Sequence, residues 1–258
     1  MLRFWPIPVF ADNYVWVLER EGSRRVVVVD PGDAAPVLAA VERRKLEIAT
    51  VLVTHHHHDH TGGLGEVVRR IAPPVYGPAR EAIAGVDRPV ADGDRVELDE
   101  LEIALDVAEV PGHTLGHVAY LAPAFALVGD TLFAGGCGRV FEGSFEQMHA
   151  SLQRLADQPP ATEIYCAHEY TVANLRFAAT VEPGNRALGQ RLAAAEAARA
   201  TGQATVPSHL ADELATNPFL RCAVPAVVAA AEAHAGRSLD PGAEVFGVVR
   251  RWKDGFAA

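Results

Sequence analysis

The chain has 258 residues, 49% of them hydrophobic, which is enough for one large domain or two modest ones with packed cores. Its formal net charge is −10, from 23 basic and 33 acidic residues. This balance argues against a general nucleic-acid-binding protein, which needs Lys and Arg to neutralise phosphates.

The cysteine content and the apolar runs restrict the cellular setting. Three widely spaced cysteines form neither a disulfide framework nor a CxxC site, which favours a reducing compartment. No apolar run approaches the ~20 residues of a membrane span. Pro6, Pro8 and Asp12 interrupt the N-terminal segment, so no signal-like apolar core develops there. We therefore expect a soluble, cytoplasmic protein with no membrane partner. We also expect a monomer and, from the net charge, no nucleic-acid partner.

Strands and helices alternate over residues 1–172. The helix expected at 144–156 has the clearest start signal, because Ser144 and Gln147 form a capping-box pattern. Apolar runs between turn residues predict strands at 15–18, 25–29, 48–53, 75–76, 95–98, 101–110, 118–121, 125–128 and 164–166, and helical spacing predicts further helices at 36–44 and 65–71.

The sequence changes character after residue 172. Strand signals vanish, and Gly and Pro residues separate Ala-rich segments that favour helix. The helices expected in this part are 171–180, 186–201, 208–215, 223–235 and 243–249. We therefore predict two domains, 1–172 and 173–258.

A run of histidines is the most informative stretch. The segment 54–60 reads Thr-His-His-His-His-Asp-His, follows a hydrophobic strand and precedes a Gly-rich turn. Neutral imidazoles and carboxylates are the usual ligands of zinc and similar divalent metals. His55 and His57, two residues apart, can reach one metal from the same side of an extended segment. Asp59 and His60 are aimed differently and could hold a second ion.

Less specific interpretations of this run remain. Poly-His segments can be purification tags or low-complexity sequence, but this one is internal and interrupted by Asp59. His56 and His58 do not fit the ligand spacing, so we interpret them as non-ligands.

Further donors stand at the ends of predicted strands. His113 lies in a tight turn after one strand, and Asp130 and His168 end two others. A lone His is more often a core or surface residue than a ligand, but strand ends on one rim of a sheet are where distant ligands converge. Asp130 could bridge two cations, because it has two oxygens and its charge offsets theirs.

These motifs resemble the metallo-β-lactamase superfamily and, within it, glyoxalase II, the hydroxyacylglutathione hydrolases. The His-x-His-x-Asp-His pattern is specific only to the superfamily, whereas the Cys-Gly-basic segment and the C-terminal Arg-Arg-x-Lys-Asp indicate the subfamily. The resemblance covers essentially the whole chain, through residues 10–14, 30–32, 54–63, 111–114, 129–133, 136–139, 141–143, 167–171, 174–178, 181–185, 217–221 and 250–254.

The resemblance implies a fold and a metal centre. The fold would be an α/β protein, an αββα sandwich followed by a helical C-terminal domain that contributes to binding of a glutathione thioester. One ion would be held by His55, His57 and His113, the other by Asp59, His60 and His168, with Asp130 and a water-derived hydroxide between them. Two divalent ions are implied, most commonly zinc, with iron or manganese as alternatives.

The implied reaction is hydrolysis of S-D-lactoylglutathione to D-lactate and glutathione, the second step of methylglyoxal detoxification. Asp59 and Asp130 would orient the water or accept its proton. Glutathione carboxylates need cations, and by resemblance Arg139, Arg250 and Lys253 supply them, with a hydroxyl from Tyr170. A solvated helix end is the alternative interpretation of Arg250 and Lys253.

Several residues are given other roles. Phe141 stands where many relatives carry Tyr, which removes one hydroxyl from the expected substrate contacts. His117 is expected to support a metal ligand, and Cys137 and Cys166 are expected to be structural.

Other functions remain as alternatives. The superfamily includes lactonases, β-lactamases and persulfide dioxygenases, the last with one iron. A di-iron electron-transfer or oxygen-reducing protein would have Glu at position 57 and an attached flavin domain, and neither feature is present in this sequence. A non-catalytic metal-storage protein would bind metal tightly without hydrolysing any thioester.

Overall fold

The computed structural model describes residues 1–256, and clustering of the backbone divides the chain into two compact units. Unit 1 comprises Met1–Glu109, Thr114–Ala122 and Ala126–Gly129. Unit 2 comprises Val110–His113, Pro123–Phe125 and the described residues from Asp130 onward. The predicted boundary after residue 172 follows the change in composition instead, and it stays a prediction.

Unit 1 contains a mixed six-stranded sheet in the order β1-β2-β3-β4-β5-β6. The first three strands are antiparallel, and β3 to β6 are parallel. The run of four valines in β3 is buried on both faces, as expected of an inner strand in a parallel sheet. The strands are β1 (Leu2–Val9), β2 (Asn13–Arg20), β3 (Arg25–Val29), β4 (Glu47–Leu52), β5 (Val75–Pro78) and β6 (Arg88–Val90).

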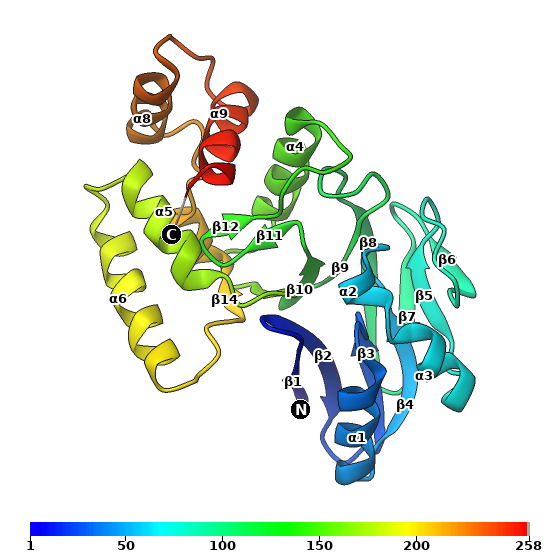
Figure 1. Cartoon of the computed structure of the whole chain (residues 1–258). Coiled ribbons are helices and arrows are strands. Elements are labelled where there is room, and N and C mark those ends of the chain that lie inside the picture. Colours follow the sequence, from blue (N-terminus) through cyan, green and yellow to red (C-terminus); the bar gives the residue numbers. More distant parts are fainter. Residues whose placement is uncertain (257–258) are drawn as a thin grey trace. The chain divides into compact units, whose positions relative to one another are not determined.

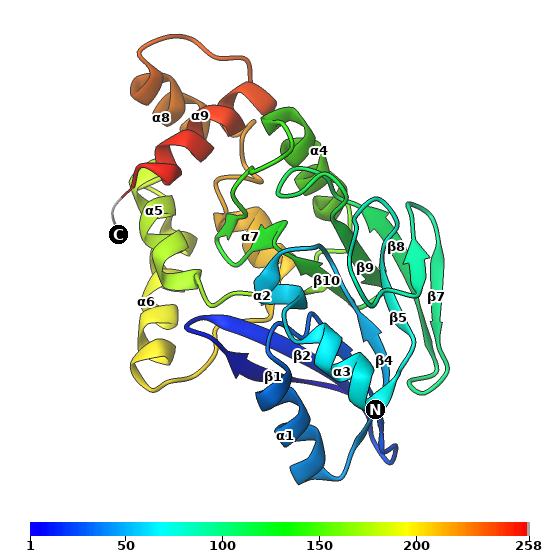
Figure 2. The same ribbon diagram turned by 45° about the vertical axis from the view of Figure 1, so that its right-hand side comes forward.

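Two helices pack against one face of this sheet (Figures 1 and 2). They are α1 (Ala34–Arg44) and α3 (Leu64–Ile71), and the short α2 (His58–Thr61) precedes α3. Val37 and Val41 of α1 and Leu64 of α3 share a buried core with the valines of β2, β3 and β4. Burial of such side chains contributes about 1.5–3 kcal/mol each, so this core holds the parallel strands and the loops at their ends in place.

Unit 1 also contains β7 (Arg95–Leu98), β8 (Ile103–Glu109), β9 (Val118–Ala122) and most of β10 (Phe125–Gly129). They are neighbours in the order β10-β9-β8-β7. Tyr120 of β9 is fully buried and donates a hydrogen bond to the carbonyl of Val53 at 2.9 Å, which ties these strands to the end of β4. Burial raises the pKa of Tyr120 well above its ordinary value, so the phenol stays protonated.

The N-terminal strand β1 is the clearest difference from the sequence expectation. The first strand predicted from the sequence is 15–18, and none is predicted over residues 2–9, which contain Pro6 and Pro8. In the structure β1 is an edge strand, paired only on the side of β2. Proline is tolerated at such an edge because its missing N–H is not needed by a second neighbour.

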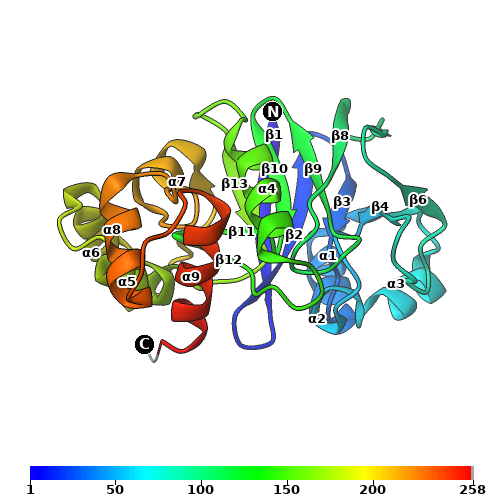
Figure 3. The ribbon, with the colours of Figure 1, turned by 90° about the horizontal axis from the view of Figure 1, so that it is seen from above.

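Unit 2 is mainly helical. Its strands are short, namely β11 (Leu132–Phe133), β12 (Gly136–Cys137), β13 (Glu163–Cys166) and β14 (Ser208–His209). Its helices are α4 (Phe145–Ala156), α5 (Thr171–Val181), α6 (Arg186–Ala200), α7 (Leu210–Thr216), α8 (Pro225–Ala235) and α9 (Ala243–Asp254). Figure 3 shows α5 to α9 as one group.

The helices of this unit agree with the sequence expectation, but the expectation is wrong at residues 208–209. The five helices expected after residue 170 are present, and α9 extends five residues beyond the expected end at residue 249. Strand β14, which pairs with β13, lies where only helix was predicted. Two paired residues leave no hydrophobic period, so a strand this short is invisible in the sequence. None of the helices in residues 1–256 is long and apolar enough to cross a membrane.

The capping box of α4 gives a stability prediction. Ser144 accepts a hydrogen bond from the backbone N–H of Gln147, and the Gln147 side chain accepts one from the backbone N–H of Ser144. We expect Ser144→Ala to lower the free energy of unfolding by about 1 kcal/mol, measured by urea denaturation. Ser238→Ala, at an exposed loop position, should change it by less than about 0.5 kcal/mol. Equal unfolding midpoints for the two variants would contradict the role of the cap.

Candidate metal and substrate sites

The histidine run lies at the carboxyl end of β4. Residues up to His57 are extended, and α2 begins at His58. His55 is fully buried and His60 almost so, with ring centroids 4.1 Å apart, while the His57 ring lies 4.7 Å from that of His55. The chain changes from extended to helical between His57 and His58, and the division of these four residues between two ions stays a prediction.

Asp30 orients the buried end of this loop. It follows the parallel strand β3, so it reaches the same sheet edge as the histidine run. Its carboxylate accepts hydrogen bonds from the backbone N–H of Thr54 at 2.8 Å and from the Thr54 hydroxyl at 2.7 Å, and it lies 3.1 Å from Nδ1 of His60. Holding Nδ1 turns Nε2 of His60 away from Asp30, the orientation that a metal-ligating imidazole needs.

The other donors of the loop are also held. Asn13 donates a 2.8 Å hydrogen bond to Oδ2 of Asp59. The His117 ring stacks on the His55 ring, with centroids 4.6 Å apart and planes 18° from parallel. Gly129 makes room for this stack, since a Cβ there would lie 2.8 Å from the His117 ring. The arrangement agrees with the expectation that His117 supports a metal ligand.

The two remaining histidines of the run have other surroundings. His58 is exposed. Nδ1 of His56 lies 3.0 Å from Oε2 of Glu81, whose other oxygen accepts a hydrogen bond from the Thr114 hydroxyl and one from the Gly116 backbone N–H. The interpretation of His56 and His58 as non-ligands stays a prediction. Glu81 is not among the residues predicted from the sequence, although its position shortly after the parallel strand β5 is a usable signal.

Unit 2 brings three more predicted ligands together. Nε2 of His113 lies 3.5 Å and Nε2 of His168 lies 3.3 Å from the same oxygen of Asp130, Oδ2. All three side chains are buried. Nδ1 of His113 is 2.8 Å from the carbonyl oxygen of Arg139, so that nitrogen donates and Nε2 faces Asp130.

The donor sets of both units fit divalent metal ions. Each unit presents a buried imidazole held through Nδ1, His60 in unit 1 and His113 in unit 2, with a carboxylate oxygen beside its Nε2. Burying a carboxylate is costly unless a cation or several hydrogen bonds compensate. The chemistry of the His and Asp clusters therefore indicates a binuclear metal centre, without identifying the metal.

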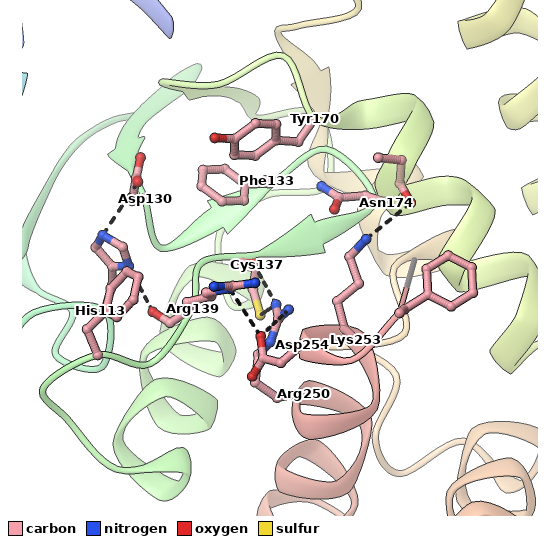
Figure 4. A pocket seen from close by; sticks show the side chains of 13 residues that line it. His113, Asp130, Phe133, Cys137, Arg139, Tyr170, Asn174, Arg250, Lys253 and Asp254 are labelled. Carbon is pink, nitrogen blue, oxygen red and sulfur yellow. Dashed lines mark hydrogen bonds and ion pairs between the residues drawn. The ribbon is translucent and has the colours of Figure 1, made fainter. Parts of the chain in front are cut away.

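A cavity of about 430 Å³ in unit 2 opens beside Asp130 and His113 (Figure 4). That volume lies within the usual range for small-molecule sites. All four residues predicted to bind substrate line it, namely Arg139, Tyr170, Arg250 and Lys253. Phe141 lines it too, with its ring 5.3 Å from that of His113.

The C-terminal cations are not a solvated helix end. Arg250 is only 4% exposed. It donates to the carbonyl of Cys137 at 2.9 Å and to Asp254 at 3.0 Å. Lys253 is half-buried, with Nζ 5.4 Å from the Phe177 ring centroid and 3.3 Å from the carbonyl of Ala173. Burial and the nearby Arg250 lower the pKa of Lys253 to about 8.

The cysteines carry no sign of nucleophilic chemistry. Cys137, Cys166 and Cys222 are buried free thiols. Burial raises the pKa of Cys137 to about 11 and that of Cys166 to about 12. A thiol reacts as its thiolate, so both stay unreactive near neutral pH, in agreement with the structural role expected from the sequence.

Comparisons with known proteins agree with this architecture. Residues 10–168 match the sequence model of the metallo-beta-lactamase superfamily. ETHE1 from Myxococcus xanthus has a similar fold, with a TM-score of 0.64 at 21% identity over 98% of both chains. The di-iron-bound form of TTHA1623 gives a TM-score of 0.54 at 29% identity over 64% of this chain and 91% of that chain. The fold is therefore the metallo-β-lactamase fold that the sequence predicted.

The C-terminal residues identify the family within this superfamily. Residues 169–256 match the model described as hydroxyacylglutathione hydrolase C-terminus. The hydroxyacylglutathione hydrolase of Alkalilimnicola ehrlichii is 55% identical over 98% of this chain and 99% of its own. That of Halorhodospira halophila is 53% identical over 96% and 97% of the two chains. The chain belongs to the hydroxyacylglutathione hydrolase family, which confirms the family predicted from the sequence.

The contacts of Asp30 generate a prediction about metal binding. We expect Asp30→Ala to reduce metal affinity by about 10–100-fold, because it leaves Thr54 and His60 without the carboxylate that orients them. The measurement is metal content after titration with a chelator. Asp33→Ala removes a neighbouring carboxylate that caps α1, so it should cost stability without changing metal content. Loss of metal in both variants to the same extent would contradict a specific role for Asp30.

Proposed function

We propose that this protein hydrolyses the thioester of S-D-lactoylglutathione to D-lactate and glutathione, the second step of methylglyoxal detoxification. The observation that carries the proposal lies within unit 2. A cluster of His113, Asp130 and His168 stands beside a cavity that is lined on its other side by Arg139, Arg250 and Lys253. A metal-ligand cluster beside a cationic pocket suits an anionic substrate with a hydrolysable bond.

We propose the following metal assignment. His55, His57 and His113 would hold one divalent ion, Asp59, His60 and His168 would hold the other, and Asp130 would be a ligand common to both. Family membership over nearly the whole chain and the orientation of His60 and His113 support this assignment. Imidazole and carboxylate donors suit zinc best, and they also accept iron or manganese.

Bound divalent ions supply Lewis acidity and lower the pKa of a water molecule to about 7. Side chains of the protein orient this water molecule and accept its proton. Asp59, fixed by its hydrogen bond from Asn13, and Asp130, fixed between His113 and His168, orient the attacking water and accept its proton. Asp130 is buried, and the low local dielectric strengthens its interactions with His113 and His168.

The leaving group suits this arrangement. A thiol has a pKa of about 8.5, so a thiolate departs from the tetrahedral intermediate without a strong general acid. An amine from a peptide bond would need a proton donor at that point, so thioesters fit better than amides.

The glutathione moiety has two carboxylates, and the cavity offers cations for them. Arg139 and Lys253 lie on its wall, where they can pair with carboxylates, and Tyr170 adds a hydroxyl. Arg250 also lines the cavity, where it donates a hydrogen bond to the carbonyl of Cys137 and adds positive charge. Its bonds to Cys137 and Asp254 give it a second task, because they hold the wall of the cavity together.

We further propose that residues 1–172 form the catalytic domain and that residues 173–258 contribute to thioester binding. The two family models meet between residues 168 and 169, which supports a boundary near this position. A cytoplasmic monomer is the proposed form, and the three buried free cysteines support a reducing compartment.

The first prediction tests the reaction. Purified protein should hydrolyse S-D-lactoylglutathione, followed as loss of thioester absorbance, with about two metal ions per chain counted in the same sample. Asp130→Ala should lower both metal content and kcat/KM, the latter by more than about 100-fold. Asp157→Ala, at the exposed end of α4, should leave both unchanged. Two bound metals with turnover of a lactone or a persulfide but not of the thioester would refute the proposed substrate.

The second prediction concerns Lys253. The pKa of this lysine is lowered to about 8, so its charge is present below this pH and is lost as the pH rises through it. We expect KM for the anionic thioester to rise above about pH 8 while kcat changes little, measured as initial rates from about pH 7 to 9. Lys253→Arg keeps its charge throughout this range, so its KM should stay flat. A wild-type KM that rises no more than that of the Arg variant would rule out this role.

A further inference from the structure

The β11–β12 hairpin, residues 132–137, connects two parts of the proposed site. Asp130 precedes it and Arg139 follows it. Each strand has only two residues, and the pairs are Leu132 with Cys137 and Phe133 with Gly136. A hairpin this short is not stable by itself in water, so the positions of Asp130 and Arg139 depend on other contacts.

Side chains from the helices of unit 2 supply these contacts at the tip of the hairpin. Asn217, which ends α7, donates to the carbonyls of Phe133 at 3.3 Å and Gly136 at 2.9 Å. Glu213 of α7 accepts a 2.8 Å hydrogen bond from the backbone N–H of Gly135. Both flanks and the turn of the hairpin are therefore bonded to α7 and its C-cap.

The two α7 side chains form one buried unit. Glu213 and Asn217 are fully buried and joined to each other by a 3.0 Å hydrogen bond. Arg191 of α6 pairs with the other oxygen of Glu213, which compensates the buried charge. A buried ion pair with this geometry is rigid, because any movement would leave a charge without its partner.

The glycines of the hairpin leave no space for a side chain. Gly135 has a φ of +68°, and a Cβ there would meet Leu175 at 2.7 Å. A Cβ on Gly136 would meet the side chain of Asn174 at 2.6 Å, and one on Gly138 would lie 1.9 Å from the carbonyl oxygen of Asp130. The chain is thus packed closely from the tip of the hairpin down to Asp130.

We propose that Glu213 and Asn217 are positioning residues for the reaction, acting through the hairpin on Asp130 and Arg139. The inference rests on the proposed function, because Asp130 and Arg139 have their roles from it. Asp130 must keep one oxygen within 3.5 Å of both His113 and His168. Glu213 and Asn217 fix the hairpin that continues from Asp130. The helices of unit 2 would therefore hold Asp130 in position as well as contact the glutathione moiety.

The test uses Glu213→Gln and Asn217→Asp in the full-length protein as purified. Glutamine keeps the shape of Glu213 but has one acceptor oxygen instead of two, so it cannot accept from both Gly135 and Arg191. Aspartate in place of Asn217 removes the donated hydrogen bonds and places a second carboxylate beside Glu213. Glu182→Gln is the matched control, since Glu182 also pairs with an arginine, Arg221, and has no hydrogen bond to the hairpin among the described residues.

Two readouts are needed. The first is kcat with S-D-lactoylglutathione, which we expect to fall by about 10–100-fold in both hairpin variants and by less than about twofold in the control. The second is hydrogen exchange over residues 132–138, which does not depend on turnover and should become at least about tenfold faster only in the hairpin variants. Thermal unfolding of Glu213→Gln and Glu182→Gln is a control. If both variants lose a similar amount of stability, a fall in kcat confined to Glu213→Gln does not come from a general loss of stability.

The outcomes separate the two hypotheses. Faster exchange with reduced kcat in the hairpin variants alone supports the positioning role, and each variant is an independent test should the other fail to fold. Unchanged kcat and exchange in Glu213→Gln, or equal losses in Glu182→Gln, would overturn it. If the wild-type protein does not hydrolyse the thioester, the proposed function fails, while faster exchange in the hairpin variants would still support the mechanical link.

Discussion

The structure depends on holding buried imidazoles through one nitrogen so that the other has a fixed direction. The Asp30 carboxylate is hydrogen-bonded to Nδ1 of His60, and the carbonyl oxygen of Arg139 is hydrogen-bonded to Nδ1 of His113. A buried imidazole without such a partner would lose solvation and could rotate between orientations. The strands and loops that carry Asp30 and Arg139 must therefore be built as accurately as the histidines themselves. This requirement explains why so much buried polar structure surrounds a small number of donors.

The two units meet this requirement differently. Unit 1 draws its donors from one continuous segment at the end of a parallel strand, where the sheet fixes the backbone and Asp30 arrives from the next strand. Unit 2 gathers His113, Asp130 and His168 from three separate segments, and its helices supply the side chains that fix the connecting loops. The long helical region after residue 172 is consistent with this need, because short loops cannot satisfy their own buried polar groups.

Much of this could be predicted from the sequence. Runs of β-branched residues predicted most strands of unit 1, and the capping pattern at Ser144 predicted the start of α4. The seven candidate metal ligands could be named from the sequence because their residue types and strand-end positions are visible locally. The edge strand β1 was missed because the effect of its prolines depends on which neighbours it has. Glu81 and Glu213 were missed for a related reason, since a buried carboxylate looks like any surface glutamate until the fold brings donors to it.

Asp30 also illustrates a conflict between stability and function. It is a non-glycine residue with a φ of +51°, a backbone conformation that side chains other than those of Asn and Asp rarely adopt. Glycine would relieve the backbone strain at this position but would lose the carboxylate that orients Thr54 and His60. The chain thus keeps a locally unfavourable conformation where the orientation of a donor depends on it. Backbone preference alone would favour glycine at this position, but that replacement would leave the buried donors of Thr54 unsatisfied and would remove the feature that prepares the loop for metal.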